Sequence, residues 1–270
     1  MEGFDPRFRD LPDYILKITK EIWEDRGLAT LRQYYGDDIV VRAPGAIVRG
    51  NEGVIAATMA TLAEFPDRTL LGEDVIWSGD DQAGFLSSHR ILSTATHLGD
   101  GMFGPATGRR LRYRIIADCF ARNNQITDEW IVRDQGAVVR QMGIEPKRYA
   151  AKRIAAEGGP KSCPQPMAPD NDPAGPYLGA GNDDPWGSRY ADILSRLMAA
   201  DLASIRTVYD RAAQLELPGG ITAHGWEAAD GFWMRLRSAL PSAEFRVHHR
   251  IGREYPLMPR RAALEPVGPP

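Results

Sequence analysis

The sequence predicts an α+β domain in which three helices pack on a curved antiparallel sheet that forms a cone, followed by a partial second copy. Residues 13–64 carry helical periodicity, and residues 68–140 contain strand-like runs separated by Gly, Asp and Asn turns. Helices that precede a long antiparallel meander pack on one face of its sheet. A return of the helical pattern after residue 188 predicts the second copy.

The helical part contains three predicted helices. In the first, Ile15, Ile18 and Ile22 recur at the spacing of one helix face, and Pro66 stops the third. A short strand over residues 39–42 separates the second helix from the third. The three helices are expected over residues 13–25, 28–35 and 51–64.

Four strand-like runs follow, and each is bounded by residues that favour turns. The tightest turn is Asn123-Asn124, a pair that tolerates the positive backbone φ of a two-residue hairpin. Strands joined by such short turns are antiparallel neighbours in one sheet. The runs cover residues 68–77, 83–97, 109–120 and 125–140.

The second half of the chain repeats the helical part of the first. Proline and glycine crowd into residues 148–187 without apolar periodicity, which predicts a linker. Beyond it, residues 202–206 correspond in register to residues 28–32, and Gly225 corresponds to Gly50. This internal repeat is too short to contain a full sheet. The expected organisation is a cone domain at 1–147, a linker at 148–187 and an incomplete second copy at 188–270.

Composition and charge exclude several classes of function. The chain carries 33 basic and 36 acidic residues and is 43% apolar, so no basic block suggests a nucleic-acid partner. No apolar run is long enough to cross a membrane, and the first ten residues lack the apolar core of a signal peptide. Neither Cys119 nor Cys163 has a partner at metal-ligand spacing. We therefore expect a cytoplasmic protein with no metal or cofactor and a small hydrophobic molecule as its partner.

Polar residues within the predicted strands are the candidates for chemistry. Asp118 interrupts an apolar run, and an acid buried in such a run has a raised pKa. Strand alternation puts Trp130 and Asp134 on one face, so we expect Asp118 and Asp134 to point into the same cone. His97 closes the preceding strand near the cone mouth. Two carboxylates and a histidine in an apolar cone can perform general acid–base catalysis without a cofactor.

Other interpretations of these residues remain open. Asp118 would be a satisfied core acid if it pairs with Arg90 or Arg112, and Asp134 would be structural if it ends a strand or forms a salt bridge. Glu129 is expected to face solvent or a partner chain, because alternation puts it opposite Trp130. His89 and His97 are each as consistent with facing solvent as with lining the pocket.

A series of short motifs between residues 13 and 143 is typical of a known family. The motifs are Phe65-Pro66-Asp67, Thr96-His97-Leu98-Gly99, Pro105-Ala106-Thr107-Gly108-Arg109 and, at the end, Glu129-Trp130, Asp134 and Gln141-Met142-Gly143. Through them the segment resembles the SnoaL-like polyketide cyclases, within the broader nuclear-transport-factor-2-like fold. The resemblance implies a helix-covered curved sheet that forms a cone, and proteins of that fold often form homodimers through the outer face of the sheet.

The resemblance also implies an activity. Known members close a polyketide ring by intramolecular aldol chemistry, with a pocket aspartate as acid/base and no metal or cofactor. Alignment at the Gln141-Met142-Gly143 end puts that aspartate at Asp134. The position of an assisting histidine in those cyclases falls near Phe120, where this chain has no histidine and Asp118 would have to take over its role from the same face.

Two functions are carried forward from the sequence. The first is a cofactor-independent acid–base enzyme of polyketide cyclase, isomerase or hydratase type, acting on a small, partly apolar carbonyl compound. The second is a non-catalytic ligand-binding or dimerisation module of the same fold. The expected catalytic residues are Asp134, Asp118 and His97, and the expected ligand-binding residues are His89, Arg90, Phe120 and Trp130.

Overall fold

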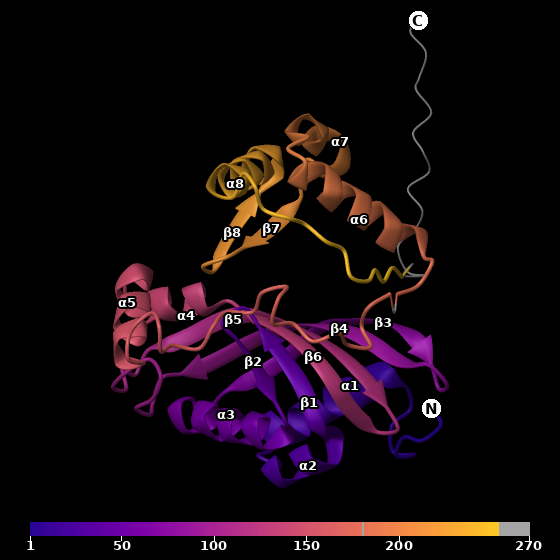
Figure 1. The fold of residues 1–270 in the computed structure, drawn as a ribbon, viewed down its shortest axis with the longest axis vertical. Coiled ribbons are helices and arrows are strands. Elements are labelled where there is room, and N and C mark those ends of the chain that lie inside the picture. The colour runs from indigo at the N-terminus through magenta and orange to yellow at the C-terminus, as the bar shows by residue number, and fades with distance from the viewer. Residues whose placement is uncertain (180, 254–270) are drawn as a thin grey trace, which may run out of the picture.

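A six-stranded sheet organises the first half of the chain in the computed structural model, which describes residues 1–179 and 181–253 (Figure 1). The strand order is β2-β1-β6-β5-β4-β3. Every neighbouring pair is antiparallel except β1 and β6, which run parallel. The expectation of a wholly antiparallel sheet is wrong at this one pair, because the long connection from β1 to β6 returns the chain in the same direction. The strands are β1 Tyr35–Ala43, β2 Ala46–Arg49, β3 Thr69–Asp80, β4 Gly84–Thr96, β5 Arg110–Arg122 and β6 Gln125–Arg133.

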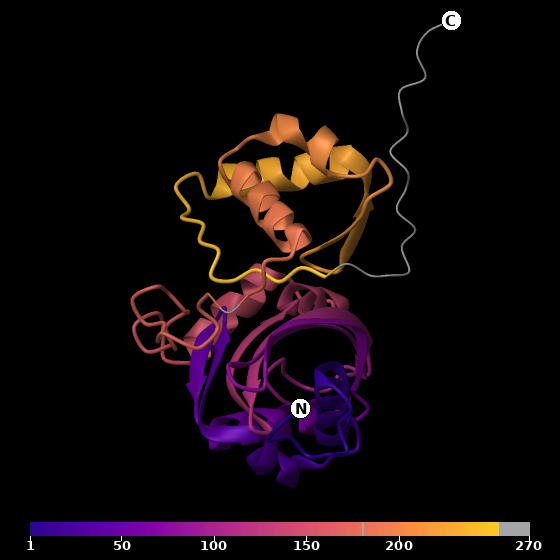
Figure 2. The same cartoon turned by 90° about the vertical axis from the view of Figure 1, so that its right-hand side faces the viewer.

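Helices cover the concave side of this sheet, which is strongly curled in Figure 2. Helix α1 (Leu11–Thr19) begins where the Asp13 N–H donates to the side chain of Asp10, and it continues as a π-helical turn over Lys20–Glu24. Its apolar face is buried against the sheet, as the periodicity predicts. Helix α3 has the predicted bounds, and helix α2 is shorter than expected. These two helices span Asn51–Glu64 and Leu31–Tyr34.

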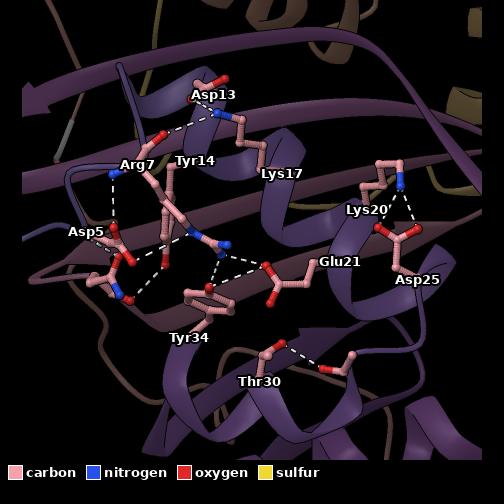
Figure 3. Close-up of polar contacts among 12 residues, drawn as sticks. Asp5, Arg7, Asp13, Tyr14, Lys17, Lys20, Glu21, Asp25, Thr30 and Tyr34 are labelled. Carbon is pink, nitrogen blue, oxygen red and sulfur yellow. Dashed lines mark hydrogen bonds and ion pairs between the residues drawn. The ribbon is translucent and has the colours of Figure 1, made fainter.

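The N-terminal segment is fastened to α1 and α2 by ion pairs and hydrogen bonds, drawn in Figure 3. The Arg7 guanidinium lies 2.6 Å from a Glu21 carboxylate oxygen and also donates to the Tyr34 hydroxyl. The Tyr14 hydroxyl donates to the backbone oxygen of Asn124 at 3.1 Å. Asn124 and Asn123 have φ of 63° and 50°, which confirms the predicted positive-φ hairpin. The segment thus closes the end of the cone where the β5–β6 hairpin turns.

The chain turns helical earlier than the sequence predicts. Strand β6 ends at Arg133, whereas the strand pattern was expected to continue to Arg140. Helices α4 (Gln135–Gln141) and α5 (Pro146–Ala156) follow. The predicted extension of the strand is wrong because the Asp134 side chain accepts the Ala137 N–H and so starts a helix. Helix α5 also occupies the first residues of the expected linker.

The second half of the chain has a small core of its own. Leu197, Ile205, Leu215, Ala229 and Trp233 form this buried cluster. The order of a 3-10 turn, a short helix, a two-stranded hairpin and a long helix is the order of the first half. The interpretation as a partial second copy stays a prediction, and residues 254–270 of that copy lie outside the described residues. The elements are α6 Pro185–Met198, the 3-10 turn Leu202–Ser204, α7 Ile205–Val208, β7 Gln214–Leu217, β8 Ile221–His224 and α8 Gly225–Ala239.

This second half lies on the side of the sheet opposite α1, α2 and α3 (Figure 1). An Arg114 guanidinium nitrogen lies 2.7 Å from a Glu216 carboxylate oxygen. The connecting segment contributes Tyr177, whose ring meets the Trp130 ring edge-on at 5.3 Å. The outer face of the sheet is therefore covered in part by the chain's own C-terminal half.

Candidate functional site

A cavity of about 140 Å³ lies between the concave face of the sheet and helices α1 and α3. Most of its wall is apolar, and few polar side chains reach it. Such walls are typical of sites for small, partly apolar molecules. Representative apolar lining residues are Ile15, Trp23, Val54, Leu70, Ile91 and Ile115.

The pleat of β5 and β6 decides which polar side chains line the cavity. Cys119 lies opposite Glu129 in the ladder, and Ala117 lies opposite Ile131. These four residues point inward and line the cavity, while their sequence neighbours point to the outer face. A shift of one residue exchanges the two sets.

Glu129 is the acid that the fold buries in the cavity. Its side chain is 6% exposed, and burial raises its pKa to about 7, against the opposing charge of Arg133 and a hydrogen bond from Tyr35. A carboxyl group with this pKa exchanges its proton near neutral pH, as a general base or acid must. The sequence-based expectation that Glu129 faces solvent or a partner chain is wrong.

His89 lines the same cavity from β4, as expected of a ligand-binding candidate, although no ligand tests that role. It is 2% exposed, and burial lowers its pKa to about 4, so the imidazole is neutral at pH 7. Its Nε2 has no hydrogen-bond partner within residues 1–179 and 181–253. Gly72 makes room for it, since a Cβ there would lie 2.9 Å from that nitrogen. A neutral ring with a free nitrogen can donate to, or accept from, a bound molecule.

Cys119 adds a thiol to the wall but no nucleophile. Burial, together with the charges of Glu129, Asp118 and Asp128, raises its pKa well above the ordinary value. The thiol therefore stays protonated and acts as a small apolar group.

Asp118 lies outside the cavity. It is one residue from Cys119, so its side chain points to the outer face, where an oxygen lies 3.6 Å from His249 Nε2. Trp130, its ladder partner, packs there against Tyr177 and His248. The expectation that Asp118 and Trp130 project into the cone is wrong, because the inward set of the strand is the other one. Pairing of Asp118 with Arg90 or Arg112 is not seen among the described residues.

Asp134 is a structural acid at the end of β6. Its carboxylate accepts backbone N–H bonds from Ala137 at 2.9 Å and from Gly220 at 2.8 Å. The Gly219 N–H also lies 2.9 Å and 2.8 Å from its two oxygens. The expectation of a catalytic group facing the cone is wrong for Asp134, since its oxygens are engaged by a helix N-terminus and the β7–β8 turn.

Three other expected site residues also lie away from the cavity wall. The His97 ring is fully buried between the Thr107 hydroxyl, 3.0 Å from Nδ1, and the Glu64 carboxylate, 3.1 Å from Nε2. Arg90 is on the outer face, with its guanidinium 3.3 Å from Glu73. Phe120 packs over Gly84. The predicted catalytic role of His97 and the ligand-binding roles of Arg90 and Phe120 are not supported by these positions.

The sequence did contain a signal for Glu129. In β5 the residues with the parity of Cys119 are apolar, whereas those with the parity of Asp118 include four arginines. The apolar set of a strand faces the core, which puts Cys119 inside and Asp118 outside. Antiparallel pairing across the Asn123-Asn124 hairpin then carries Glu129 inside with Cys119.

Two further properties concern only the residues that the structure describes. In them no three His, Cys, Asp or Glu side chains gather as a metal ion would require. No helix among them combines the length and apolar character needed to cross a lipid bilayer.

Comparison with known proteins finds a family model that matches the first half of the chain. Residues 14–142 match the family model described as SnoaL-like polyketide cyclase. This match covers a little less than half of the chain. No curated protein matches the sequence.

Several solved structures are similar to the same half. The candidate polyketide cyclase IdmH from Streptomyces antibioticus is 27% identical, with 49% of this chain and 98% of that chain covered and a TM-score of 0.43. A candidate SnoaL-like polyketide cyclase from Jannaschia sp. CCS1 is 18% identical, with 50% and 92% covered and a TM-score of 0.44. AclR, a candidate hydroxylase from Streptomyces galilaeus, is 19% identical, with 48% and 98% covered and a TM-score of 0.38.

Proposed function

We propose that residues 14–142, which match the family model described as SnoaL-like polyketide cyclase, form a general acid–base enzyme whose cavity is the active site and whose substrate is a small, partly apolar carbonyl compound. The observation that carries this proposal is Glu129, a carboxyl group buried in an apolar cavity that is also lined by His89, whose Nε2 has no hydrogen-bond partner among the described residues. Titratable groups held in a cleft away from their ordinary pKa are typical of catalytic sites.

Glu129 is the base in this proposal. Its carboxylate removes a proton from the carbon next to the substrate carbonyl, and the C–H electron pair moves to form the enolate. The Tyr35 hydroxyl, which is hydrogen-bonded to Glu129, orients the carboxylate. The enolate then attacks a second carbonyl, as in ring closure, or takes the proton back at another carbon, as in isomerisation. The protonated Glu129 returns the proton in either case, so the step is balanced without a cofactor.

His89 is the electrophile in the same step. Because its imidazole is neutral, the N–H tautomer at Nε2 can donate to the carbonyl oxygen as negative charge develops there. A neutral histidine suits this role, since it does not transfer a proton fully to the enolate. β4 and β6 lie on the two sides of β5, so His89 and Glu129 approach a bound molecule from different walls of the cavity.

Proton exchange tests the proposal before a natural substrate is known. The probe is 2-tetralone, an apolar bicyclic ketone with acidic protons at C1, incubated with the full chain in D₂O and followed by ¹H NMR. We expect the wild-type protein to accelerate loss of the C1 signal and Glu129→Gln to lose about 10²- to 10⁴-fold of that acceleration.

The control is Asp118→Asn, the same chemical change on the outer face of the neighbouring strand. It should exchange the probe at the wild-type rate. No acceleration by the wild type would favour the alternative of a ligand-binding module without catalysis, and equal acceleration by wild type and Glu129→Gln would exclude Glu129 as the base.

A further inference from the structure

Two arginines on the cavity wall have no carboxylate partner. Arg68 is only 5% exposed, and its Nε donates to the Ser93 hydroxyl at 3.3 Å. It is also hydrogen-bonded to the Tyr113 hydroxyl, and burial lowers its pKa. Arg133 lines the same cavity from β6. Across residues 1–179 and 181–253, no carboxylate lies within 4.0 Å of either guanidinium.

This arrangement leaves the cavity positively charged. Of its titratable lining groups, Arg68 and Arg133 are cationic, His89 is neutral at pH 7 and Glu129 is the one acid. The wall therefore carries a net charge of about one positive when Glu129 is ionised and about two when Glu129 is protonated. A buried charge without an opposite charge destabilises the fold, because desolvation of the ion is not offset.

The other arginine buried among the described residues does not share this property. Arg42, which is fully buried, lies 2.7 Å from Asp128 and also pairs with Asp172. The fold thus neutralises a buried guanidinium where its function is structural. The absence of such a partner at Arg68 points to an anion that arrives with a ligand.

The arginines and the proposed base are offset along the strands of the cavity wall, although the charge of Arg133 still acts on Glu129. Arg133 follows Glu129 by four residues on the same face of β6, a separation of roughly 13 Å along the strand. Ser93, the partner of Arg68, follows His89 by four residues on β4. Between the two ends the wall is apolar, with Ile91, Ile115 and Ile131.

From this juxtaposition, and resting on the proposed function, we propose that the substrate is a keto acid: Arg68 and Arg133 bind its carboxylate, the isoleucine wall holds an apolar framework, and the carbonyl lies between Glu129 and His89. The side chains reach inward from both ends and shorten the distance to be spanned. A framework of about two fused rings fills what remains. Arg68 makes the larger contribution because it is buried, and Arg133, which is exposed, admits the anion at the opening.

A matched pair of ligands tests this inference by isothermal titration calorimetry on the full chain at pH 8. The probes are 2-tetralone-6-carboxylate and its neutral methyl ester. We expect the acid to bind about 10- to 100-fold more tightly than the ester, the range of charge-assisted hydrogen bonds. In Arg68→Met the acid should fall to the affinity of the ester, while the affinity for the ester changes little.

A second variant guards against misfolding of Arg68→Met, whose fold is checked by circular dichroism and thermal unfolding. Arg133→Met, at the exposed end, should retain the fold and lose part of the preference for the acid. Equal affinity of the wild type for acid and ester, including undetectable binding of both, overturns the inference. So does a preference for the acid that survives the double replacement.

The same titrations separate this inference from the proposed function. Glu129→Gln keeps both arginines, so it should keep the preference for the acid even though it exchanges no protons. If the preference is present and proton exchange is absent in the wild type, the anion site stands and the enzyme does not. If exchange of 2-tetralone is rapid but the acid has no advantage, the enzyme stands and the anion site does not.

Discussion

Each face of the β5–β6 pair buries an acidic residue, but the two acids have different surroundings. On the inner face, Glu129 is buried in a cavity, with burial raising its pKa to about 7. On the outer face, Asp128 is buried too, but its oxygen lies 2.7 Å from the Arg42 guanidinium. The two acids are sequence neighbours. Their difference shows that the pleat assigns an acid to a face, and that the partner it finds there decides between chemistry and structure.

The outer face is also where the two halves of the chain meet. The rings of Trp130, Tyr177 and His248 pack together, and Arg42 binds the connecting segment through Asp172 and the Pro173 backbone oxygen. The polar groups of the outer face mainly hold the C-terminal half. The inner face keeps His89, whose Nε2 has no partner among the described residues, and Arg68, which has no carboxylate partner among them.

The sharpest test of this comparison is the pH profile of proton exchange. If Glu129 is the base, the wild-type rate with 2-tetralone should rise with pH through about 7 and then level, following ionisation of that carboxyl. Glu129→Gln should be flat and about 10²- to 10⁴-fold slower on the plateau. The rates are measured by NMR between pH 5 and 9. A wild-type profile without an inflection near 7 would exclude Glu129 as the titrating base.

Replacement of Arg42 on the outer face should destabilise the fold rather than abolish proton exchange. Arg42→Met leaves Asp128 buried without its partner, which should lower the free energy of unfolding by about 3–5 kcal/mol. Urea denaturation followed by tryptophan fluorescence measures this loss. The control, Arg90→Met, removes an exposed arginine paired with Glu73 on the same face and should cost about 0–1 kcal/mol. Similar losses in both variants would refute the structural role of Arg42.

The inner acid should instead weaken the fold when it ionises. Glu129 keeps its proton in the folded state up to about pH 7, against an ordinary value of 4.5, so its favourable contribution is complete below pH 4.5 and lost as the pH rises through 7. Glu129→Gln should therefore gain roughly 3 kcal/mol over the wild type between pH 4.5 and 8. Urea titrations at both pH values measure the difference. Titration of His89 cancels, since both proteins contain it. Parallel pH dependence of the two proteins would contradict the buried, unpaired position of Glu129.

The smallest effect is expected at Asp134, where the two halves share a carboxylate. Asp134→Ala removes the cap of α4 and the acceptor of the Gly219 and Gly220 N–H groups. A loss of about 1–2 kcal/mol is expected, with faster proteolytic cleavage between residues 157 and 184. Asp134→Asn retains a capping oxygen and should lose less. Proton exchange by either variant should equal that of the wild type, and a loss of exchange without unfolding would restore Asp134 as a catalytic candidate.

Local patterns in the sequence were enough for much of the fold. The bounds of α3 follow from its periodicity and the Pro66 stop, and the positive φ of Asn123 and Asn124 follows from their residue type. Helix α4 was missed because a cap acts through one side chain, and Asp134 at the end of an apolar run fits a strand equally well. β2 was missed because four residues carry little periodicity.

The sequence predicted the kind of site, a carboxyl group and a histidine in an apolar cone. On β5 and β6 it assigned the site to residues one position away from those that line the cavity. The prediction that an α+β cone buries polar groups on β4, β5 and β6 followed from local pattern, because alternation with a period of two is a property of each strand alone. Which of the two alternate sets faces inward could not be read from that pattern, since it depends on how the sheet curls around α1 and α3 and on what covers its other side. Here the C-terminal half covers the outer face and engages Asp118, Trp130 and Asp134, while Glu129 and His89 are left to the cavity.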